Sequence, residues 1–395
     1  MKIVVQKFGG TSVSTLERRQ RIVEKVKNCL EEGNMPVVVV SAMGRKGEPY
    51  ATDTLLSLVS SDFTKDNLHA TDLLMSCGEI LSTVVMCDEL KKANIEAMPL
   101  TGGQAGIRTD SNFANAGVLN VNTENLDDLI SKGIIPVIAG FQGQDKNGYI
   151  TTLGRGGSDV TGALIGAALK AERVEIYTDV DGMMTTDPRV VPEASLIEKI
   201  SYEEIFQFAD QGTKVIHPRA VTIAQKYNIP LLIRNTMNDC EGTLISNVVD
   251  YADRPPVTGI ACMNNRTQIR ISYNSNENYF KILESLAENN ISLDLINVFP
   301  KEKIFTIDSK NLSKLKEIVE ELNLDCSITE HCSKLSIIGS GMKGIPGVMA
   351  KILIALTRNN VEVLQTADSH MTIWCLIKEE EATKAIAAIH KEFKL

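Results

Sequence analysis

The chain has 395 residues, a length that predicts two or three domains, each with room for a full hydrophobic core. Hydrophobic residues make up 43% of the chain and charged residues 23%, which are ordinary globular values and exclude disordered and fibrous proteins. The formal net charge of −9 argues against nucleic-acid and anionic-membrane partners.

The N-terminus and the distribution of apolar residues favour a cytoplasmic protein. The chain starts directly in a strand pattern at Lys2–Val5, without the composition of a signal or transit peptide. No apolar run approaches the ~20 residues that span a bilayer, so we expect no membrane segment. The eight cysteines are scattered without a CxxC pair, so we expect neither disulfides nor a protein metal site.

The first 250 residues alternate short apolar strands with helical stretches. The strands are continuous Val/Ile-rich runs, typical of a parallel sheet that is covered on both faces. They are Lys2–Lys7, Pro36–Ser41, Ile95–Leu100, Ile134–Gly140, Arg173–Thr178 and Ile229–Thr236. This pattern predicts an α/β domain with a mainly parallel sheet over residues 1–250.

Two local signals accompany these strands. Leu16–Leu30 has helical periodicity, and Ser14 and Glu17 have the spacing of a capping box at its start. Asn147-Gly148 predicts a hairpin between residues 140–144 and 149–153.

A break at Asp250–Pro256 precedes a region that repeats with a period of ~65 residues. Each repeat has a βαββαβ pattern, but the second repeat lacks its last strand. One strand, Val257–Cys262, is left over after the break, and we predict that it fills the vacant sheet edge. The first module then covers residues 264–330 and is inserted within the second, which covers 257–263 and 331–395.

Three glycine-rich turns follow strands of the first domain. The first, residues 7–12, has adjacent glycines that let backbone N–H groups approach an anion, while Lys7 adds a cation suited to a transferring phosphoryl group. The second is residues 41–44. The third is GRGGSD (154–159), where Arg155 can clamp a carboxylate and Asp159 enters a helix over Val160–Leu169. Each turn alone also fits a plain tight turn, but together they lie where α/β sheets bind ligands.

Two further motifs have weaker functional interpretations. Gly339, Gly341 and Gly344 form a GxGxxG, but a module of ~65 residues is too small for a two-halved dinucleotide-binding sheet, so a packing or small-ligand loop is favoured. His217 is favoured as a structural residue, because phosphoryl transfer to an ionised carboxylate needs no general base.

The absence of GxxxxGK[ST] argues against a P-loop NTPase.

Taken together, these segments resemble the aspartokinases of the amino-acid kinase family. The matching motifs are KFGGTSV (7–13), SAMG (41–44), SCGE (76–79), GRGGSD (154–159), YTDVDG (177–182), TTDPR (185–189), GTKVIHPR (212–219) and IRNT (233–236). The paired repeats are similar to the ACT regulatory modules of these enzymes. Residues 41–53 and 367–374 are most similar to the diaminopimelate-sensitive aspartokinases of spore-forming bacteria. The fold implied is a three-layer αβα sandwich followed by two ferredoxin-like ACT modules.

The resemblance implies that ATP phosphorylates the side-chain carboxylate of L-aspartate, the first step toward lysine, threonine, methionine and diaminopimelate. Lys7 and Asp159 would be the catalytic residues. Glu79 would bind the α-ammonium group and Arg155 the α-carboxylate, in a subsite completed by Thr52, Gly156, Gly157 and Ser158. The nucleotide would contact Lys7, Phe8, Gly9, Gly10, Ser41, Thr178, Asp179, Met184, Arg189 and Lys214. The backbone N–H groups of Gly9 and Gly10 would bind the phosphates, and Mg²⁺ would bridge ATP oxygens without a dedicated protein ligand.

One position departs from the family pattern. Met184 stands where many relatives place an aromatic residue beside the adenine, which bears on nucleotide affinity rather than on the chemistry.

The ACT pair implies feedback by an end-product amino acid, with diaminopimelate and lysine as the candidates and a concerted response with threonine left open. The effector would bind the first loop of the first module, at Asn274, Ser275, Asn276 and Asn278. It would link two subunits of a homodimer or homotetramer joined through the ACT modules, and shift the kinase toward an inactive state. The loop of the second module would serve dimer packing.

Other functions share parts of this pattern. Glutamate, acetylglutamate and uridylate kinases have the same fold, but SCGE together with GRGGSD and the ACT tail argue against them. A fused homoserine dehydrogenase is not expected for this length. A non-catalytic ACT amino-acid sensor is the alternative from another class, against which the intact Lys7, Glu79, Arg155 and Asp159 argue.

Overall fold

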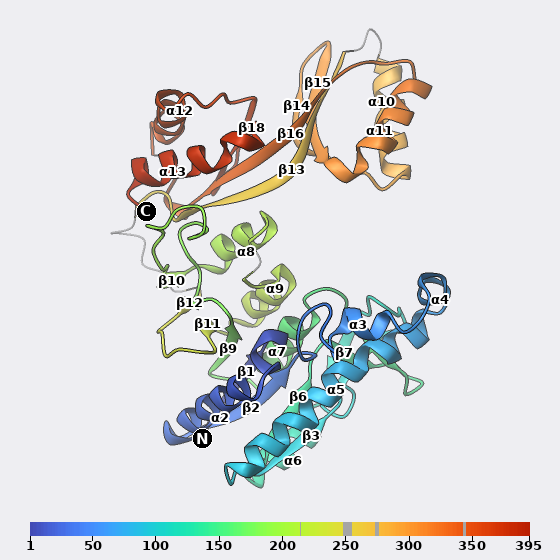
Figure 1. Ribbon diagram of the computed structural model, residues 1–395, viewed down its shortest axis with the longest axis vertical. Helices are drawn as coiled ribbons and strands as arrows, with labels where there is room; N and C mark the ends of the chain where they lie inside the picture. The colour runs from blue at the N-terminus through green and yellow to red at the C-terminus, as the bar shows by residue number, and fades with distance from the viewer. Residues whose placement is uncertain (214, 248–254, 273–275, 343–344) are drawn as a thin grey trace. The chain divides into compact units, whose positions relative to one another are not determined.

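A computed structural model describes residues 1–213, 215–247, 255–272, 276–342 and 345–395 (Figure 1). The chain separates into two compact units. The N-terminal unit comprises Met1–Met183, Leu196–Ala209 and Lys214–Val249, and the C-terminal unit comprises Met184–Ser195, Asp210–Thr213 and Asp250–Leu395.

The N-terminal unit is built on an eight-stranded sheet with the order β10-β12-β11-β9-β1-β2-β6-β3. All of its neighbouring strands are parallel except β11 and β12, so the prediction of a mainly parallel sheet is confirmed. Each of the six predicted strands corresponds to a strand of this sheet. The bounds are β1 (Lys2–Phe8), β2 (Asn34–Val40), β3 (Ala97–Leu100), β6 (Ile135–Ala139), β9 (Arg173–Thr178), β10 (Lys199–Ile200), β11 (Leu231–Asn235) and β12 (Thr243–Ile245).

Helices cover both faces of this sheet, as expected for an αβα sandwich. On one face, α2 (Leu16–Glu31) and α5 (Leu68–Lys92) bury Ile22 and Met86 against Phe8 and Val38. On the other face lies α7 (Gly157–Ala168), whose Gly162 approaches the Lys7 side chain, and α9 packs beside α7. The remaining helices are α1 (Gly10–Val13), α3 (Thr52–Leu56), α4 (Ser61–Asp66), α6 (Glu124–Ser131), α8 (Tyr202–Asp210) and α9 (Pro218–Tyr227).

The start of α2 differs from the prediction. Thr15, not Ser14, is the N-cap residue, and its side chain accepts a hydrogen bond from the Arg18 backbone N–H. The Ser14 hydroxyl instead donates to the Thr11 carbonyl, which satisfies it within the preceding turn. The predicted N-cap is therefore wrong by one residue, and the predicted capping box does not form, because Arg18 rather than Glu or Gln stands three positions after Thr15.

Helix α5 also departs from the expectation that no apolar run is long enough to cross a membrane. Among the described residues it is the one helix that is long and apolar enough by length and composition alone, with 25 residues that include an 18-residue window of mean hydropathy 1.4. Core helices pass the same test. Here α5 packs on β3 and β6, and its buried positions include the carboxylates of Asp72, Glu79 and Glu89.

A second, four-stranded sheet with the order β5-β4-β7-β8 lies in the same unit. Its strands are β4 (Ile107–Thr109), β5 (Val118–Val121), β7 (Gln142–Gln144) and β8 (Ile150–Thr152). The predicted hairpin is confirmed, since β7 and β8 pair antiparallel around Asn147-Gly148. In its turn, the Asp145 carboxylate accepts hydrogen bonds from the Asn147 and Tyr149 backbone N–H groups.

The C-terminal unit has one six-stranded antiparallel sheet with the order β14-β15-β13-β16-β18-β17. Its strands are β13 (Gly259–Ser272), β14 (Asp294–Val298), β15 (Glu302–Asp308), β16 (Asp325–Ile338), β17 (Gln365–Asp368) and β18 (Thr372–Lys378). The predicted leftover strand, Val257–Cys262, corresponds to the start of β13. There, residues 259–263 pair with residues 334–338 of β16.

Separate strands were expected in each repeat, but β13 and β16 run continuously through both. Residues 263–266 and 329–333 contain no glycine or proline to stop a strand. The junction between the two modules is marked only by a local irregularity within these strands. Pairing is irregular between Met263 and Gln268, and φ is positive at Asn265 and His331.

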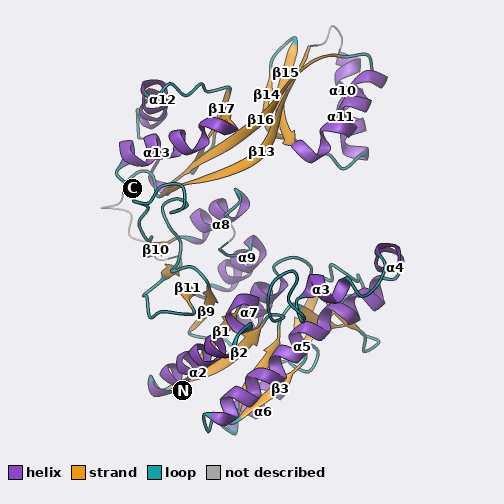
Figure 2. Ribbon diagram, in the orientation of Figure 1, coloured by secondary structure: helices purple, strands orange, loops and turns teal. Residues whose placement is uncertain are grey.

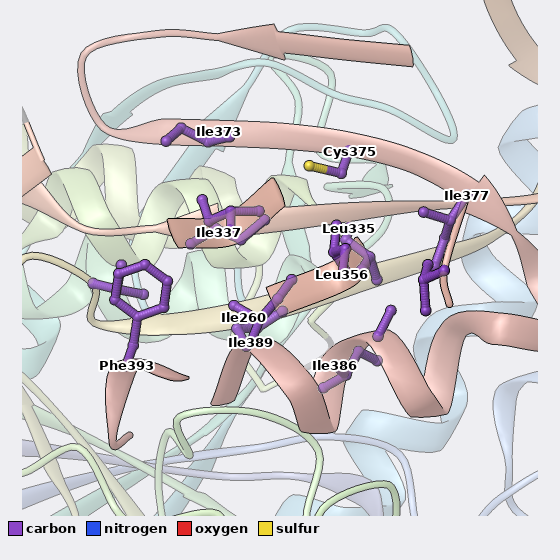
Figure 3. Packing of buried hydrophobic residues seen from close by; sticks show 14 of the residues in the cluster. Ile260, Leu335, Ile337, Leu356, Ile373, Cys375, Ile377, Ile386, Ile389 and Phe393 are labelled. Atoms are coloured by element: carbon purple, nitrogen blue, oxygen red, sulfur yellow. The ribbon is translucent and has the colours of Figure 1, made fainter. Parts of the chain in front are cut away.

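Two pairs of helices pack on the six-stranded sheet, one pair at each end of it (Figure 2). Helices α10 (Asn276–Glu288) and α11 (Leu312–Glu321) bury a core around Phe305, and α12 (Val348–Arg358) and α13 (Ala382–Phe393) bury a second core with Ile260, Leu335 and Phe393 (Figure 3). Short 3₁₀ turns occupy Ser309–Asn311, Ser340–Met342 and Glu379–Glu381.

The GxGxxG segment has a packing role in its described part. A Cβ atom on Gly339 would lie 2.2 Å from the Pro256 carbonyl oxygen, so only glycine allows this close approach. Gly344 lies outside the described residues.

Candidate active site

A cavity of about 360 Å³ lies in the N-terminal unit, where β1, β2 and β6 end. This volume is in the range of small-molecule sites. It is lined by Lys7, Gly10, Ser41, Ala42, Gly44, Thr52, Glu79, Phe141, Gly156, Gly157, Ser158 and Asp159. All three glycine-rich turns of the sequence therefore contribute to one cavity.

Lys7 and Asp159 form an ion pair in this cavity. The Lys7 Nζ atom lies 2.6 Å from Asp159 Oδ1, and both side chains are largely buried, with 11% and 14% of their surface exposed. Lys7 comes from the end of β1 and Asp159 from the first turn of α7. The other carboxylate oxygen, Oδ2, accepts a hydrogen bond from the His217 backbone N–H at 3.3 Å. The pair holds a cation at the mouth of an N–H-rich turn, an arrangement suited to phosphate.

The first two turns approach each other closely. A Cβ atom on Gly10 would lie 2.6 Å from the Ala42 carbonyl oxygen, and the Gly44 N–H donates to the Gly10 carbonyl at 3.0 Å. The Gly9 N–H donates to the Tyr177 carbonyl at 3.3 Å, so in this structure it is engaged within the protein rather than directed at a ligand. The buried Phe8 ring stacks on Tyr177 with its centroid at 4.7 Å and does not line the cavity.

Glu79 is a buried carboxylate in the same cavity, with 3% of its surface exposed. Its carboxylate is hydrogen bonded by the Ala42 backbone N–H, but Oε2 has no hydrogen-bond partner among the residues that the structure describes. Burial raises the pKa of Glu79 to about 8. A buried, incompletely bonded carboxylate of this kind is suited to receive a ligand ammonium group.

The third turn lies across the cavity at the start of α7. Gly156 is the N-cap residue with φ of 69°, and a Cβ atom there would lie 2.1 Å from the His217 ring. Gly157 and Ser158 line the cavity, as does Thr52 at the start of α3. Arg155 is exposed on the turn and is not among the lining residues.

His217 has a structural role in this geometry. It caps α9, where its Nδ1 atom accepts a hydrogen bond from the Arg219 backbone N–H at 3.3 Å. Burial lowers the pKa of His217. These contacts support the structural interpretation over a general base.

The predicted nucleotide residues are only partly brought together. Thr178 ends β9 in the N-terminal unit and Asp179 follows it, with the Asp179 carboxylate paired with Arg45 at 2.5 Å. Met184 and Arg189 belong to the C-terminal unit, and the exposed Arg189 pairs with Asp187 at 2.7 Å. Lys214, the last predicted nucleotide residue, lies outside the residues that the structure describes. The same holds for the predicted effector residues Asn274 and Ser275 and for the side chains of Asn276 and Asn278.

Sequence analysis did not identify two contributors to this region. Phe141 lines the cavity directly after β6. Because ligands bind at the carboxyl ends of parallel strands, Gly140-Phe141 could have been found as a fourth turn of this kind. Arg45 has no comparable signal, since it stands in an exposed loop among other charged residues.

Comparison with known proteins agrees with this geometry. Residues 2–235 match the amino acid kinase family, and residues 327–391 match the ACT domain. Over the whole length of both chains, the sequence is 41% identical to aspartokinase 1 of Bacillus subtilis.

Two solved structures are similar over the full length of both chains, each with 26% sequence identity. They are E. coli aspartokinase III in complex with aspartate and ADP (R-state), with a TM-score of 0.79, and the same enzyme in complex with lysine and aspartate (T-state), with a TM-score of 0.80. The chain thus belongs to the amino acid kinase family, as an aspartokinase with a C-terminal ACT region.

Proposed function

We propose that this protein transfers the γ-phosphoryl group of ATP to the side-chain carboxylate of L-aspartate, giving ADP and 4-phospho-L-aspartate. The observation that carries the proposal is the cavity itself, which is lined by the Lys7 cation, the first glycine turn and the buried Glu79. One oxygen of the Glu79 carboxylate has no hydrogen-bond partner among the residues that the structure describes. The cation and the glycine turn suit a phosphate donor, and the Glu79 carboxylate suits the α-ammonium group of an amino acid.

The chemistry follows from how the substrate would be held. Glu79 would bind the α-ammonium group, while Arg155 and the Gly156–Ser158 turn would bind the α-carboxylate. The side-chain carboxylate is then the one free to attack the γ-phosphorus. A new P–O bond forms, the bond from the γ-phosphorus to the bridging oxygen breaks, and the electron pair leaves on ADP. Lys7 would stabilise the charge on the transferring group, with Asp159 holding Lys7 in place.

Mg²⁺ is expected with ATP, because phosphoryl-transfer sites require charge neutralisation at the phosphates. Among the described residues, no group of three or more His, Cys, Asp or Glu side chains could hold a metal ion. We propose that the oxygens of ATP chiefly hold this ion.

Regulation by an end-product amino acid is part of the proposal. The E. coli relative was solved with lysine and aspartate in its T-state, and the present chain has a matching ACT region. We propose lysine or diaminopimelate as the effector, bound at residues 274–278 between subunits of a homodimer or homotetramer, and leave a concerted response with threonine to the assay below. A cytoplasmic location is proposed with this biosynthetic role.

Aspartyl-hydroxamate formation tests the activity directly. The protein is mixed with ATP, Mg²⁺, aspartate and hydroxylamine, alone and with lysine, diaminopimelate or threonine. Trapped product supports the kinase, and the compound that suppresses it identifies the effector. Absence of product from a folded protein that still binds one of these amino acids would contradict the proposal and favour an amino-acid sensor.

A further inference from the structure

Asp72 is a fully buried carboxylate outside the cavity lining. It lies on α5, seven residues before Glu79, and therefore on the same side of the helix two turns earlier. None of the expected catalytic or binding roles involves it.

The Asp72 carboxylate joins three separate segments of the chain. It accepts hydrogen bonds from Thr152 at 2.8 Å through the backbone N–H and at 2.7 Å through the hydroxyl. The Ala114 backbone N–H lies 3.0 Å from each of its oxygens. Helix α5, the end of β8 and the loop 110–117 are thus connected through one side chain.

The position of Thr152 gives these bonds their significance. Thr152 is the last residue of β8, and the turn that lines the cavity begins two residues later at Gly154. Between them, the Leu153 N–H donates to the Phe141 carbonyl at 2.8 Å and its carbonyl accepts from Arg219 at 2.5 Å. The start of the turn is therefore held on both sides, with Asp72 as its connection to α5.

Helix α5 and this turn both supply residues to the cavity that would form the aspartate subsite. Glu79 comes from α5, and Gly156, Gly157 and Ser158 come from the turn. Their separation decides whether the ammonium and carboxylate groups of one small substrate can be bound at the same time. A misplacement of 1 Å in such a site costs about 10²-fold in rate.

We propose that Asp72 is a positioning residue for the amino-acid substrate, setting the distance between Glu79 and the Gly154–Ser158 turn. This inference rests on the proposed function, because it assigns the α-amino acid moiety of aspartate to these two elements. Asp72 does not touch the substrate and acts through Glu79 and the turn.

Asp145 provides a matched control on the same hairpin. It is also a buried aspartate, 3% exposed, and accepts hydrogen bonds from Ser111, Asn147 and Tyr149. It holds the turn between β7 and β8, whereas Asp72 holds the opposite end of β8. Asp72→Asn and Asp145→Asn make the same chemical change at the two ends of one hairpin.

The test compares the KM for aspartate, the KM for ATP and the melting temperature of the two variants. In Asp72→Asn, the amide NH₂ replaces one carboxylate oxygen, so a single neutral oxygen is left for the Thr152 and Ala114 backbone N–H groups, and the bonds that join the segments weaken. We expect the KM for aspartate to rise by about tenfold or more, with the KM for ATP changed by less than about twofold. Asp145→Asn should lower the melting temperature without a selective effect on aspartate. An equal change of both KM values in Asp72→Asn, or the same aspartate defect in Asp145→Asn, would overturn the inference.

A second pair of variants covers the case in which Asp72→Asn does not fold. Thr152→Val removes the hydroxyl donor and keeps the β-branched shape, while Thr152→Ser keeps the hydroxyl. Thr152→Val should raise the KM for aspartate selectively, and Thr152→Ser should restore it. Equal aspartate KM values in both variants and the wild type would contradict the role of Asp72. A wild-type protein without hydroxamate product fails the proposed function itself, which separates the two outcomes.

Discussion

Lys7 Nζ lies 2.6 Å from Asp159 Oδ1, and this ion pair joins the end of β1 to the first turn of α7. Because both side chains are largely buried, the pair excludes most solvent from the cation that would face the γ-phosphate. A charge fixed in advance costs little reorganisation when the phosphoryl group moves. The contact thus links the fold of the sheet to the proposed chemistry.

This relationship predicts different consequences for its two partners. Lys7→Ala removes the cation and should lower kcat by about 10²- to 10³-fold. Asp159→Asn keeps the cation but releases its position, so kcat should fall less. Hydroxamate formation at saturating aspartate and ATP measures both, with Lys2→Ala as a surface control because Lys2 forms an exposed ion pair. A larger loss in Asp159→Asn than in Lys7→Ala would contradict this assignment of roles.

The two adjacent glycines of the first turn predict a second contrast. A Cβ atom on Gly10 would lie 2.6 Å from the Ala42 carbonyl oxygen, whereas one on Gly9 would meet no atom closer than 3.7 Å. Gly10→Ala should therefore displace the 41–44 turn and destabilise the N-terminal unit by about 1–3 kcal/mol, while Gly9→Ala should fold normally. Denaturant unfolding of both variants provides the measurement. Equal stability of the two would show that the turns separate without cost.

The parts of the site that could be predicted from the sequence are those with a local signature. Lys7 stands at the end of β1 and the 41–44 turn follows β2, and such positions meet at one edge of a parallel sheet whatever the details of packing. The 154–159 turn instead follows β8 of the four-stranded sheet and reaches the cavity at the start of α7. All three turns line one cavity, but the parallel-sheet argument accounts only for the first two.

Other features depend on contacts between distant segments and have no such signature. Asp72 is one acidic residue within a long helix, and its role becomes visible only when Thr152 is beside it. Met184 and Arg189 stand a few residues after β9 in the sequence, yet they fold as part of the C-terminal unit. The continuity of β13 and β16 likewise has no local signature, because the two strands pair with each other along their whole length, through both modules.

His390 predicts an effect of acid on the C-terminal unit. Its Nε2 atom lies 3.0 Å from the Thr185 hydroxyl, and burial lowers its pKa although the nearby Glu193 raises it. The unfolded chain therefore binds a proton on this histidine more readily than the folded one. The stability that neutral His390 contributes is present above its ordinary pKa of 6.5 and is lost as the pH falls below that value.

Thermal unfolding between pH 5 and 8 checks this effect. The melting temperature of the wild type should fall more steeply below about pH 6.5 than that of His390→Gln, which cannot be protonated. His370→Gln is a control, because His370 is exposed. Parallel curves for the wild type and His390→Gln would contradict the prediction.

Glu79 predicts a pH dependence of aspartate use. Burial raises its pKa, whereas burial lowers the pKa of His390. Burial raises the pKa of Glu79 to about 8, so below that pH the carboxyl group is largely protonated in the free enzyme. An ammonium group is bound best by the ionised carboxylate. The kcat/KM for aspartate should therefore rise with pH, by about tenfold per unit, and level off near pH 8.

The Glu79→Gln variant separates this ionisation from other groups that titrate in the same range. It should have a much lower kcat/KM for aspartate and should lose the rise toward pH 8, while the KM for ATP keeps the pH dependence of the wild type. Stability gives a readout without substrate. The unfolded chain ionises Glu79 near 4.5 and the folded chain only near 8, so wild-type stability falls relative to the variant as the pH rises between these values. A rise in kcat/KM for aspartate that persists unchanged in Glu79→Gln would assign the titration to another group and remove Glu79 from the ammonium subsite.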